Sequence, residues 1–315
     1  MTQATGKILV IRGGAIGDFI LTIPVLQALK KHFPETHLEV LGYPKVANLA
    51  VEAGWAQSTK SIEAPGLARF FAPRGPVPPE WLQYFAQFDI IITYLFDPDA
   101  LFQNNVSSSG KHHYIKGPHR PNEKLNLHAV DVFLKPLEKL AIYETGLLPD
   151  LSRLGSIQTK NQKETIQIAI HPGSGSPKKN WPLNKWKDLL QQLLVAPEVK
   201  ILVVAGEAER EIAEEFVQCF PSARTHLMMN KPLDDVSRAL SQSEAFIGHD
   251  SGISHMAAAL ELPSVILWGP TNMNIWRPVG KRVTIIESDT GIQGITSRQV
   301  IREVNRLLEI GKSFQ

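Results

Sequence analysis

The chain has 315 residues, of which 43% are hydrophobic and 20% charged, a composition that excludes a disordered or low-complexity protein. A net charge of +2 is too small to indicate a nucleic-acid-binding protein, although it suits a protein that meets anionic substrates. Because one hydrophobic core rarely keeps growing to this length, we expect two domains.

The single cysteine, Cys219, excludes an internal disulfide and a metal site built from paired cysteines. Such sparing use of cysteine is typical of a reducing compartment. No stretch approaches the ~20 apolar residues that a membrane-spanning helix needs. We therefore expect a cytoplasmic protein, for which any membrane contact must be peripheral.

Strands and helices alternate through the first half of the chain. Apolar runs predict strands at 7–11, 38–41 and 89–93, and helical spacing predicts helices at 19–33, 46–53, 79–87 and 126–140. Residues 96–124 are polar, rich in histidine and interrupted by glycine and proline, so we expect loops there. Residues 148–164 lack an apolar period and read as a linker, which places a domain boundary after residue 155.

The second half repeats this alternation. We expect strands at 166–170, 200–205, 245–249 and 264–268, and helices at 183–194, 209–220, 233–242, 254–261 and 297–310. Strands separated by helices of this length favour parallel sheets covered on both faces. The prediction is an α/β protein of two doubly wound, Rossmann-like domains, 1–155 and 156–315, facing across a ligand-binding cleft. The last helix is expected to pack back on the first domain.

The first candidate loop, Arg12 to Asp18, contains Gly13, Gly14 and Gly17 and leads from a strand into a helix, where bare amides suit an anion. It is not the dinucleotide fingerprint, because Arg12 stands where a glycine is needed, and this disfavours NAD. Asp18 has two interpretations. It is either a helix cap or a general base for an acceptor hydroxyl, and position alone does not separate them.

The second loop, His171 to Pro182, also follows a strand and precedes a helix. Its small residues, the hydroxyls of Ser174 and Ser176 and two lysines suit a diphosphate. The alternative is a surface turn with solvated lysines. Of the two lysines, Lys179 is the better candidate for a phosphate contact because it lies next to the start of the helix.

The third loop, Gly248 to His255, opens another helix, whose N-terminus favours phosphate. Asp250 and Ser251 are either ligands or caps, and His255 is either a ligand or a core histidine. Residues 268–272 form a fourth turn that could close one wall of a nucleotide pocket. The Asp97–Asp99 string has the DxD form of a metal motif, but we interpret it as a turn and expect no metal.

Three segments resemble, in order, the signature regions of glycosyltransferase family 9, the heptosyltransferases: ILVIRGGAIGDFILTIPVLQAL, IAIHPGSGSPKKNWPLNKW and FIGHDSGISHMAAALELPSVILWGPTN. The resemblance implies a GT-B fold and an inverting transfer that needs no metal or cofactor. It also implies a nucleotide-sugar donor of the ADP-heptose type, bound chiefly by the C-terminal domain. The implied acceptor is a glycolipid such as the lipopolysaccharide inner core.

The same resemblance assigns roles to individual residues. Asp18 matches the family's proposed base, Lys179 matches a lysine on the donor phosphate, and Ser174 and Ser176 stand in that lysine's loop. Further matches are Asp250, Ser251, Gly252 and His255 at the diphosphate and sugar, and Glu209 near the ribose, a role that Glu207 could also fill. In this scheme Lys179 and the helix N-terminus at Ser251 stabilise the leaving diphosphate.

The chain also departs from the family pattern. Asn272 stands where many relatives have aspartate, and the segment after Arg277 is short. Lys111, His112, Arg120 and Lys124 of the acceptor-side loops could meet lipid A or inner-core phosphates, but we interpret them as part of a solvated polar loop and assign them no role. The alternatives are a GT-B transferase or epimerase that uses another nucleotide sugar, or a hydrolase, and a non-catalytic nucleotide-sugar-binding protein. A donor screen separates the first group, and nucleotide affinity without turnover identifies the last.

Overall fold

The computed structural model describes residues 6–73, 76–155 and 165–308, and its internal contacts divide the chain into two units, Met1–Leu148 and Pro149–Gln315. The linker expected over 148–164 lies partly outside the described residues, so its extent and the boundary after residue 155 stay predictions. Each unit contains its own parallel β-sheet.

The sheet of the first unit has five strands among the described residues, all parallel, in the order β3-β2-β1-β4-β5. The strands are β1 Lys7–Arg12, β2 His37–Gly42, β3 Ser58–Ser61, β4 Ile90–Thr93 and β5 His113–Lys116. β1 lies at the centre and reads as an unbroken apolar run because helices cover both of its faces.

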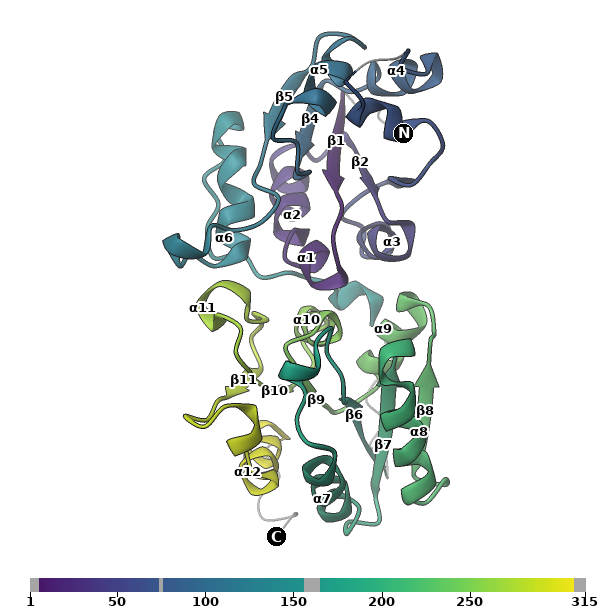
Figure 1. Cartoon of the computed structure of the whole chain (residues 1–315), viewed down its shortest axis with the longest axis vertical. Coiled ribbons are helices and arrows are strands. Elements are labelled where there is room, and N and C mark those ends of the chain that lie inside the picture. The colour runs from purple at the N-terminus through teal and green to yellow at the C-terminus, as the bar shows by residue number, and fades with distance from the viewer. Residues whose placement is uncertain (1–5, 74–75, 156–164, 309–315) are drawn as a thin grey trace. The chain divides into compact units, whose positions relative to one another are not determined.

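Helices cover both faces of this sheet (Figure 1). They are α1 Ile16–Ile20, α2 Ile23–His32, α3 Pro44–Glu52, α4 Pro79–Phe85, α5 Leu101–Ser107 and α6 Ala129–Leu134, with 3₁₀ turns at Leu67–Phe71, Glu123–Leu125 and Lys135–Leu140. Leu9 and Ile11 of β1 pack with Phe85 of α4 and Phe102 of α5. α2 contacts α6.

Two expectations for the first unit are wrong. The helix predicted at 19–33 is two helices, because the ring of Pro24 would clash with the carbonyl of Ile20, where α1 ends. The region 96–124, predicted as loops, contains α5 and β5. The sequence signal for β5 is weak because β5 is an edge strand in which only Ile115 is buried.

The sheet of the second unit has six described strands, also parallel, in the order β11-β10-β9-β6-β7-β8. They are β6 Ile166–His171, β7 Val199–Ala205, β8 Thr225–Met229, β9 Ala245–His249, β10 Ser264–Leu267 and β11 Val283–Ile286. β8 and β11 escaped prediction, as did β3 of the first unit, because all three are edge strands with partly exposed side chains.

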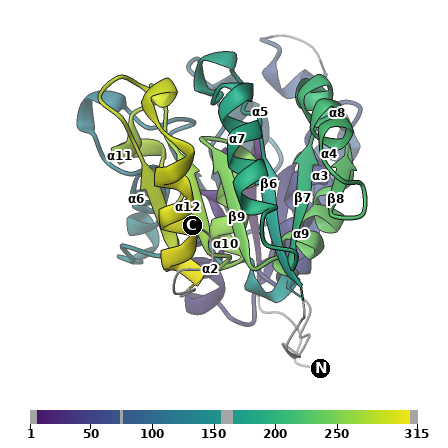
Figure 2. The ribbon, with the colours of Figure 1, turned by 90° about the horizontal axis from the view of Figure 1, so that it is seen from below.

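The helices of the second unit are α7 Leu183–Leu193, α8 Arg210–Cys219, α9 Leu233–Ser241, α10 Gly252–Ala259, α11 Met273–Trp276 and α12 Ser297–Leu308, with 3₁₀ turns at Ser152–Leu154, Pro177–Lys179, Glu207–Glu209 and Ile292–Gly294. α7, α8 and α12 share one core through Trp186, Phe216 and Val300, and Figure 2 shows α12 beside α7. α9 and α10 contact each other.

α12 packs on α7 and on strands β9 to β11 of its own unit. The expectation that the last helix packs back on the first domain stays untested. Within the described residues of both units, no helix is long and apolar enough to cross a membrane.

In each sheet the strand order reverses at one point. Two strands whose connections run to opposite sides are neighbours there: β1 and β4 in the first unit, β6 and β9 in the second. Because their crossover helices diverge, the carboxyl ends of these strands stay uncovered, and open parallel sheets bind ligands at such points. The loops after β1, β6 and β9 are the first three loops singled out from the sequence.

Candidate functional site

In the first unit, the loop after β1 brings Asp18 into the first turn of α1. Its Oδ2 accepts a hydrogen bond from the backbone N–H of Ala15 at 3.1 Å, and the side chain is 29% exposed. The carboxylate therefore caps its own helix with one oxygen while part of it still reaches solvent. The cap and the base are compatible roles. The loop offers less to a foreign anion than we expected, because Asp18 already satisfies the Ala15 amide.

Gly14 makes this cap possible. Its φ is +105°, and a Cβ there would lie 3.0 Å from Oδ2 of Asp18, so a side chain would meet both strain and a close contact. A Cβ on Gly13 would make ordinary van der Waals contact with the side chains of Tyr43, Ile62 and Leu95, at 3.8–3.9 Å. Gly17 lies inside α1.

Arg12, the last residue of β1, lies beside Asp18. Its side chain is 2% exposed, and Nη2 is 3.6 Å from Oδ1 of Asp18. Burial lowers the pKa of the Arg12 guanidinium, and the Asp18 carboxylate acts in the opposite direction. An arginine in a protein nevertheless stays protonated near neutral pH. The sequence interpretation missed Arg12, whose only signal is a charged residue at the end of a buried strand.

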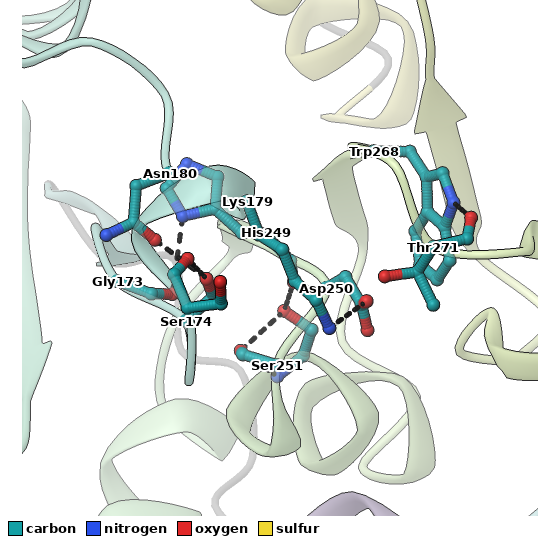
Figure 3. A network of polar contacts seen from close by, with 11 residues as sticks. Gly173, Ser174, Lys179, Asn180, His249, Asp250, Ser251, Trp268 and Thr271 are labelled. Atoms are coloured by element: carbon teal, nitrogen blue, oxygen red, sulfur yellow. Dashed lines mark hydrogen bonds and ion pairs between the residues drawn. The ribbon is translucent and has the colours of Figure 1, made fainter. Parts of the chain in front are cut away.

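In the second unit, Lys179 and Asp250 form an ion pair between the loops after β6 and β9. Nζ of Lys179 lies 2.6 Å from Oδ2 of Asp250, and the side chains are 28% and 9% exposed (Figure 3). The fold thus joins two residues of the second and third loops that are far apart in sequence. Their pairing places a cation and an anion at the uncovered strand ends.

Ser174 shapes the loop that carries Lys179. Its hydroxyl lies 2.9 Å from the carbonyl oxygen of Ser176 and 2.7 Å from Oδ1 of Asn180, so it can donate to either (Figure 3). The same Ser176 carbonyl accepts from the backbone N–H of Lys179 at 3.0 Å. Ser174 is buried by these contacts, which makes it part of the loop's frame. No sequence pattern singled out Asn180.

Ser251 caps α10, the helix that opens beside the ion pair. Its Oγ accepts from the backbone N–H of Ser254 at 3.4 Å, and Gly252 is the first helical residue. The positive end of the helix dipole therefore lies next to Asp250 in the chain. His255, one turn into the helix, is buried.

His249, in the third loop, contacts two backbone groups of the second loop. Its Nε2 accepts from the backbone N–H of Trp181 at 3.0 Å, and Nδ1 lies 3.3 Å from the carbonyl oxygen of Gly173. Only a neutral ring protonated at Nδ1 makes both bonds. Burial lowers the pKa of His249 to about 3, consistent with that state. No sequence pattern predicted these contacts of His249.

Glu209, rather than Glu207, lies against the loop after β6. A Cβ on Gly173 would fall 1.9 Å from Cγ of Glu209, so the glutamate packs on the bare face of that glycine. Its Oε2 accepts from the backbone N–H of Gly206 at 2.9 Å. Glu207 points elsewhere and pairs with Arg210 at 2.8 Å, a contact that lowers the pKa of Glu207 to about 2.

The turn at 268–272 lies beside the loop of Lys179, whereas the DPD turn at 97–99 caps a helix of the first unit. A Cβ on Gly269 would lie 3.5 Å from Cα of Lys179, so the fourth loop borders the lysine loop. Asp97 of the DPD string accepts the backbone N–H groups of Phe102 and Gln103 at 3.2 and 3.0 Å, as a cap of α5. The part of the chain that the structure describes holds no cluster of three or more His, Cys, Asp or Glu residues suited to a metal ion.

Comparisons with known proteins point to one family. A family model described as glycosyltransferase family 9 (heptosyltransferase) matches residues 125–301. Lipopolysaccharide heptosyltransferase 2 of Escherichia coli (strain K12) is 25% identical over 166 residues, which are 46% of this chain and 47% of that protein. The chain thus matches about half the length of the first curated relatives. A putative glycosyltransferase of Haemophilus influenzae is 23% identical over 301 residues, covering 87% of this chain and 86% of that protein.

A solved structure described as E. coli heptosyltransferase WaaC with ADP resembles this chain with a TM-score of 0.75 and 18% identity, covering 96% of this chain and 99% of that one. At this identity the likeness shows the fold alone. It confirms the predicted fold class of two parallel-sheet α/β domains, as found in GT-B heptosyltransferases.

Replacing Gly14 with alanine should destabilise the protein by about 1–3 kcal/mol, because the left-handed φ and the close Asp18 carboxylate both oppose a side chain. Gly175→Ala is the matched control, since among the described residues no atom other than those of Gly175 and its two chain neighbours lies within 4 Å of its Cβ position, and it should stay within about 0.5 kcal/mol of wild type. Urea unfolding followed by circular dichroism measures both. Equal stability of the two variants would contradict this account of the loop.

His249→Phe should lower the stability by about 2–4 kcal/mol near pH 7, because the ring would leave the Trp181 N–H and the Gly173 carbonyl without this partner. The loss should shrink at lower pH. In the folded protein the pKa of His249 is about 3, below its usual 6.5. The neutral ring therefore contributes its full stabilisation above about pH 6.5, and this contribution declines as the pH falls toward 3.

The difference in free energy of unfolding between wild type and His249→Phe should therefore decrease by about 2 kcal/mol as the pH falls from about 6.5 to about 5. Denaturant unfolding across this pH range measures the difference. A difference that stays constant with pH would mean that His249 is not held neutral.

Proposed function

Because this chain belongs to glycosyltransferase family 9, whose model matches residues 125–301, we propose that it is an inverting heptosyltransferase that uses ADP-heptose as donor. The acceptor in this proposal is a lipopolysaccharide inner core. The observation that carries the proposal is the Lys179–Asp250 pair beside the N-terminus of α10. The ADP in the WaaC structure supports the choice of nucleotide.

The donor diphosphate is proposed to bind at Lys179 and at the N-terminus of α10. A diphosphate attracts both the ammonium group and the positive end of the helix dipole. Asp250 pairs with Lys179 at 2.6 Å, which holds the ammonium group beside the start of α10. When the glycosidic bond to phosphate breaks, the same cation stabilises the developing charge on the leaving nucleoside diphosphate, without a divalent ion.

Asp250 and Glu209 are proposed to contact the neutral parts of the donor. Asp250 retains a second carboxylate oxygen, Oδ1, for a sugar hydroxyl. Glu209 lies against the lysine loop through Gly173, which suits a contact with the ribose better than the Arg210-paired Glu207 does. His255 and Gly252 complete the proposed donor set at the start of α10.

Asp18 is proposed to be the base that removes the proton from the acceptor hydroxyl. Its exposed fraction of 29% leaves room for such a contact while Oδ2 stays bonded to Ala15. A carboxylate fixed by its own helix needs little reorganisation before proton transfer. The acceptor is a membrane-borne glycolipid in this proposal, so the enzyme acts by peripheral contact at the inner face of the cytoplasmic membrane.

Lys179→Ala should weaken ADP binding by about 10- to 100-fold, because it removes a charged hydrogen bond worth roughly 1–3 kcal/mol and leaves Asp250 unneutralised beside the diphosphate. Isothermal titration calorimetry with ADP, UDP and GDP, without divalent metal, measures the effect. Lys178→Ala is the matched control: it removes the same charge from the same loop, at an exposed residue.

Equal losses in the two lysine variants would show only a general electrostatic contribution and would contradict a specific phosphate contact. A preference for UDP or GDP would retain the family and discard ADP-heptose. No nucleotide binding at all would remove the donor-site assignment.

Asp18→Asn should lower kcat for heptosyl transfer by about 10²- to 10⁴-fold, as expected for loss of a general base. ADP affinity should be unchanged, because the donor contacts proposed here lie in the second unit. The assay measures ADP release from ADP-heptose with heptose-deficient lipopolysaccharide as acceptor. Asp99→Asn, at an exposed carboxylate of the DPD turn, should keep wild-type activity. Activity in Asp18→Asn close to that of Asp99→Asn would exclude Asp18 as the base.

A further inference from the structure

The guanidinium of Arg12, at the end of β1, contacts two separate loops. Its Nη1 donates to the carbonyl oxygen of His119 at 2.9 Å, and its Nη2 lies 3.4 Å from the carbonyl oxygen of Asp18 and 3.6 Å from the Asp18 carboxylate. Both terminal nitrogens of the guanidinium are therefore directed to the loops at the carboxyl edge of the first sheet.

Two aromatic rings, those of Phe133 and Tyr94, pack against the guanidinium and hold it in this direction. Its central carbon lies 4.5 Å from the ring centroid of Phe133 in α6 and 5.8 Å from that of Tyr94. Tyr94 is fixed in turn, because its hydroxyl donates to the carbonyl of Phe133 at 2.6 Å. Stacking on these rings fixes the plane of the guanidinium, and with it the directions in which its N–H groups point.

The charge is not explained by stability. The Arg12 side chain is 2% exposed, and among the described residues its Nε has no hydrogen-bond partner. A buried donor without a partner costs free energy, and an apolar side chain stacked on the same rings would avoid that cost. A charged residue at this position is better accounted for by the groups that it holds in place.

One of these groups is the Asp18 carboxylate. Oδ2 is fixed by the Ala15 amide at 3.1 Å, and Oδ1 faces the guanidinium at 3.6 Å. The hydroxyl of Thr22 also donates to the Asp18 carbonyl at 2.8 Å. The carboxylate is thus restrained at both oxygens. Among the described residues, Arg12 is the only one that forms an ion pair with it.

The other group is the loop after β5. Gly117 lies against the ring of Tyr94, where a Cβ would approach to 2.5 Å, and the ring of His119 packs on Phe96 at 4.7 Å. Arg12 binds the carbonyl of His119. A single guanidinium therefore ties the Asp18 turn to the 117–119 loop.

We propose that Arg12 is a positioning residue for transfer: its guanidinium fork holds the Asp18 carboxylate and the 117–119 loop in one fixed arrangement on the acceptor side. The inference rests on the proposed function of Asp18 as base. Small displacements of a reacting group cost large factors in rate, so loss of the fork lowers kcat while the donor contacts of the second unit stay intact.

The test is a double-mutant cycle between Arg12→Met and Asp18→Asn, measured as kcat for ADP release with ADP-heptose and heptose-deficient lipopolysaccharide. Arg12→Met should lower kcat about 10- to 100-fold with unchanged ADP affinity. In the Asp18→Asn background the same change should cost less than about 3-fold, because the group that Arg12 positions is already lost.

Arg224→Met is the matched control. Arg224 also donates through Nη1 and Nη2 to two backbone carbonyls, those of Ala196 and Leu194, each at 2.9 Å. It lies just before β8, at the amino end of that strand, and its loss should leave kcat unchanged. A structural effect of removing a carbonyl-binding arginine would appear in both methionine variants.

Arg12→Lys keeps the positive charge but lacks the two N–H arms of the guanidinium. It is the variant to measure if Arg12→Met does not fold. One ammonium group cannot bond both loops, so kcat should fall about 3- to 10-fold, and the KM for the acceptor should rise as the 117–119 loop loosens. Wild-type kcat and acceptor KM in Arg12→Lys would overturn the inference, as would independent, multiplicative losses in the double-mutant cycle.

The two proposals fail in different ways. Wild-type kcat in Asp18→Asn would remove the base and this inference together. An inactive Asp18→Asn combined with an Arg12→Met as active as Arg224→Met would overturn the role of Arg12 alone.

Discussion

The structure depends on a constraint of parallel sheets, the right-handed connection between neighbouring strands. When the chain adds strands on one side of the first strand and then on the other, the crossover helices diverge and leave two strand ends uncovered. This happens at β1 and β4 in the first unit and at β6 and β9 in the second. Backbone amides and polar side chains at these ends can face a ligand without disturbing either core.

The two units use their uncovered strand ends in different ways. In the first, the loop is closed on itself: Asp18 bonds Ala15, and Arg12 restrains the same carboxylate. In the second, two separate loops are held together by a neutral histidine, His249, beneath an ion pair that reaches the surface. A fixed carboxylate suits proton transfer, whereas a cation at a helix N-terminus suits phosphate.

Sequence reasoning was reliable where a residue's role is local. The glycine loops, the central strands and the helices with a strong apolar period all follow from neighbouring residues, and each lies within a few positions of its expected place. It failed for β3, β5, β8 and β11, because edge strands are half exposed and their pairing comes from a distant strand. It also failed at 19–33, where Pro24 divides the helix.

The sequence by itself determined the fold class, the family and the loops that carry the candidate residues, because these depend on periodicity and on short strings of glycine and polar residues. Only the tertiary structure decided which of those residues meet. Lys179 contacts Asp250, Glu209 packs on Gly173, and Arg12 joins Asp18 to His119, each across a long stretch of chain or through a glycine's missing side chain. Such contacts are set by strand order and crossover direction, which no local pattern encodes.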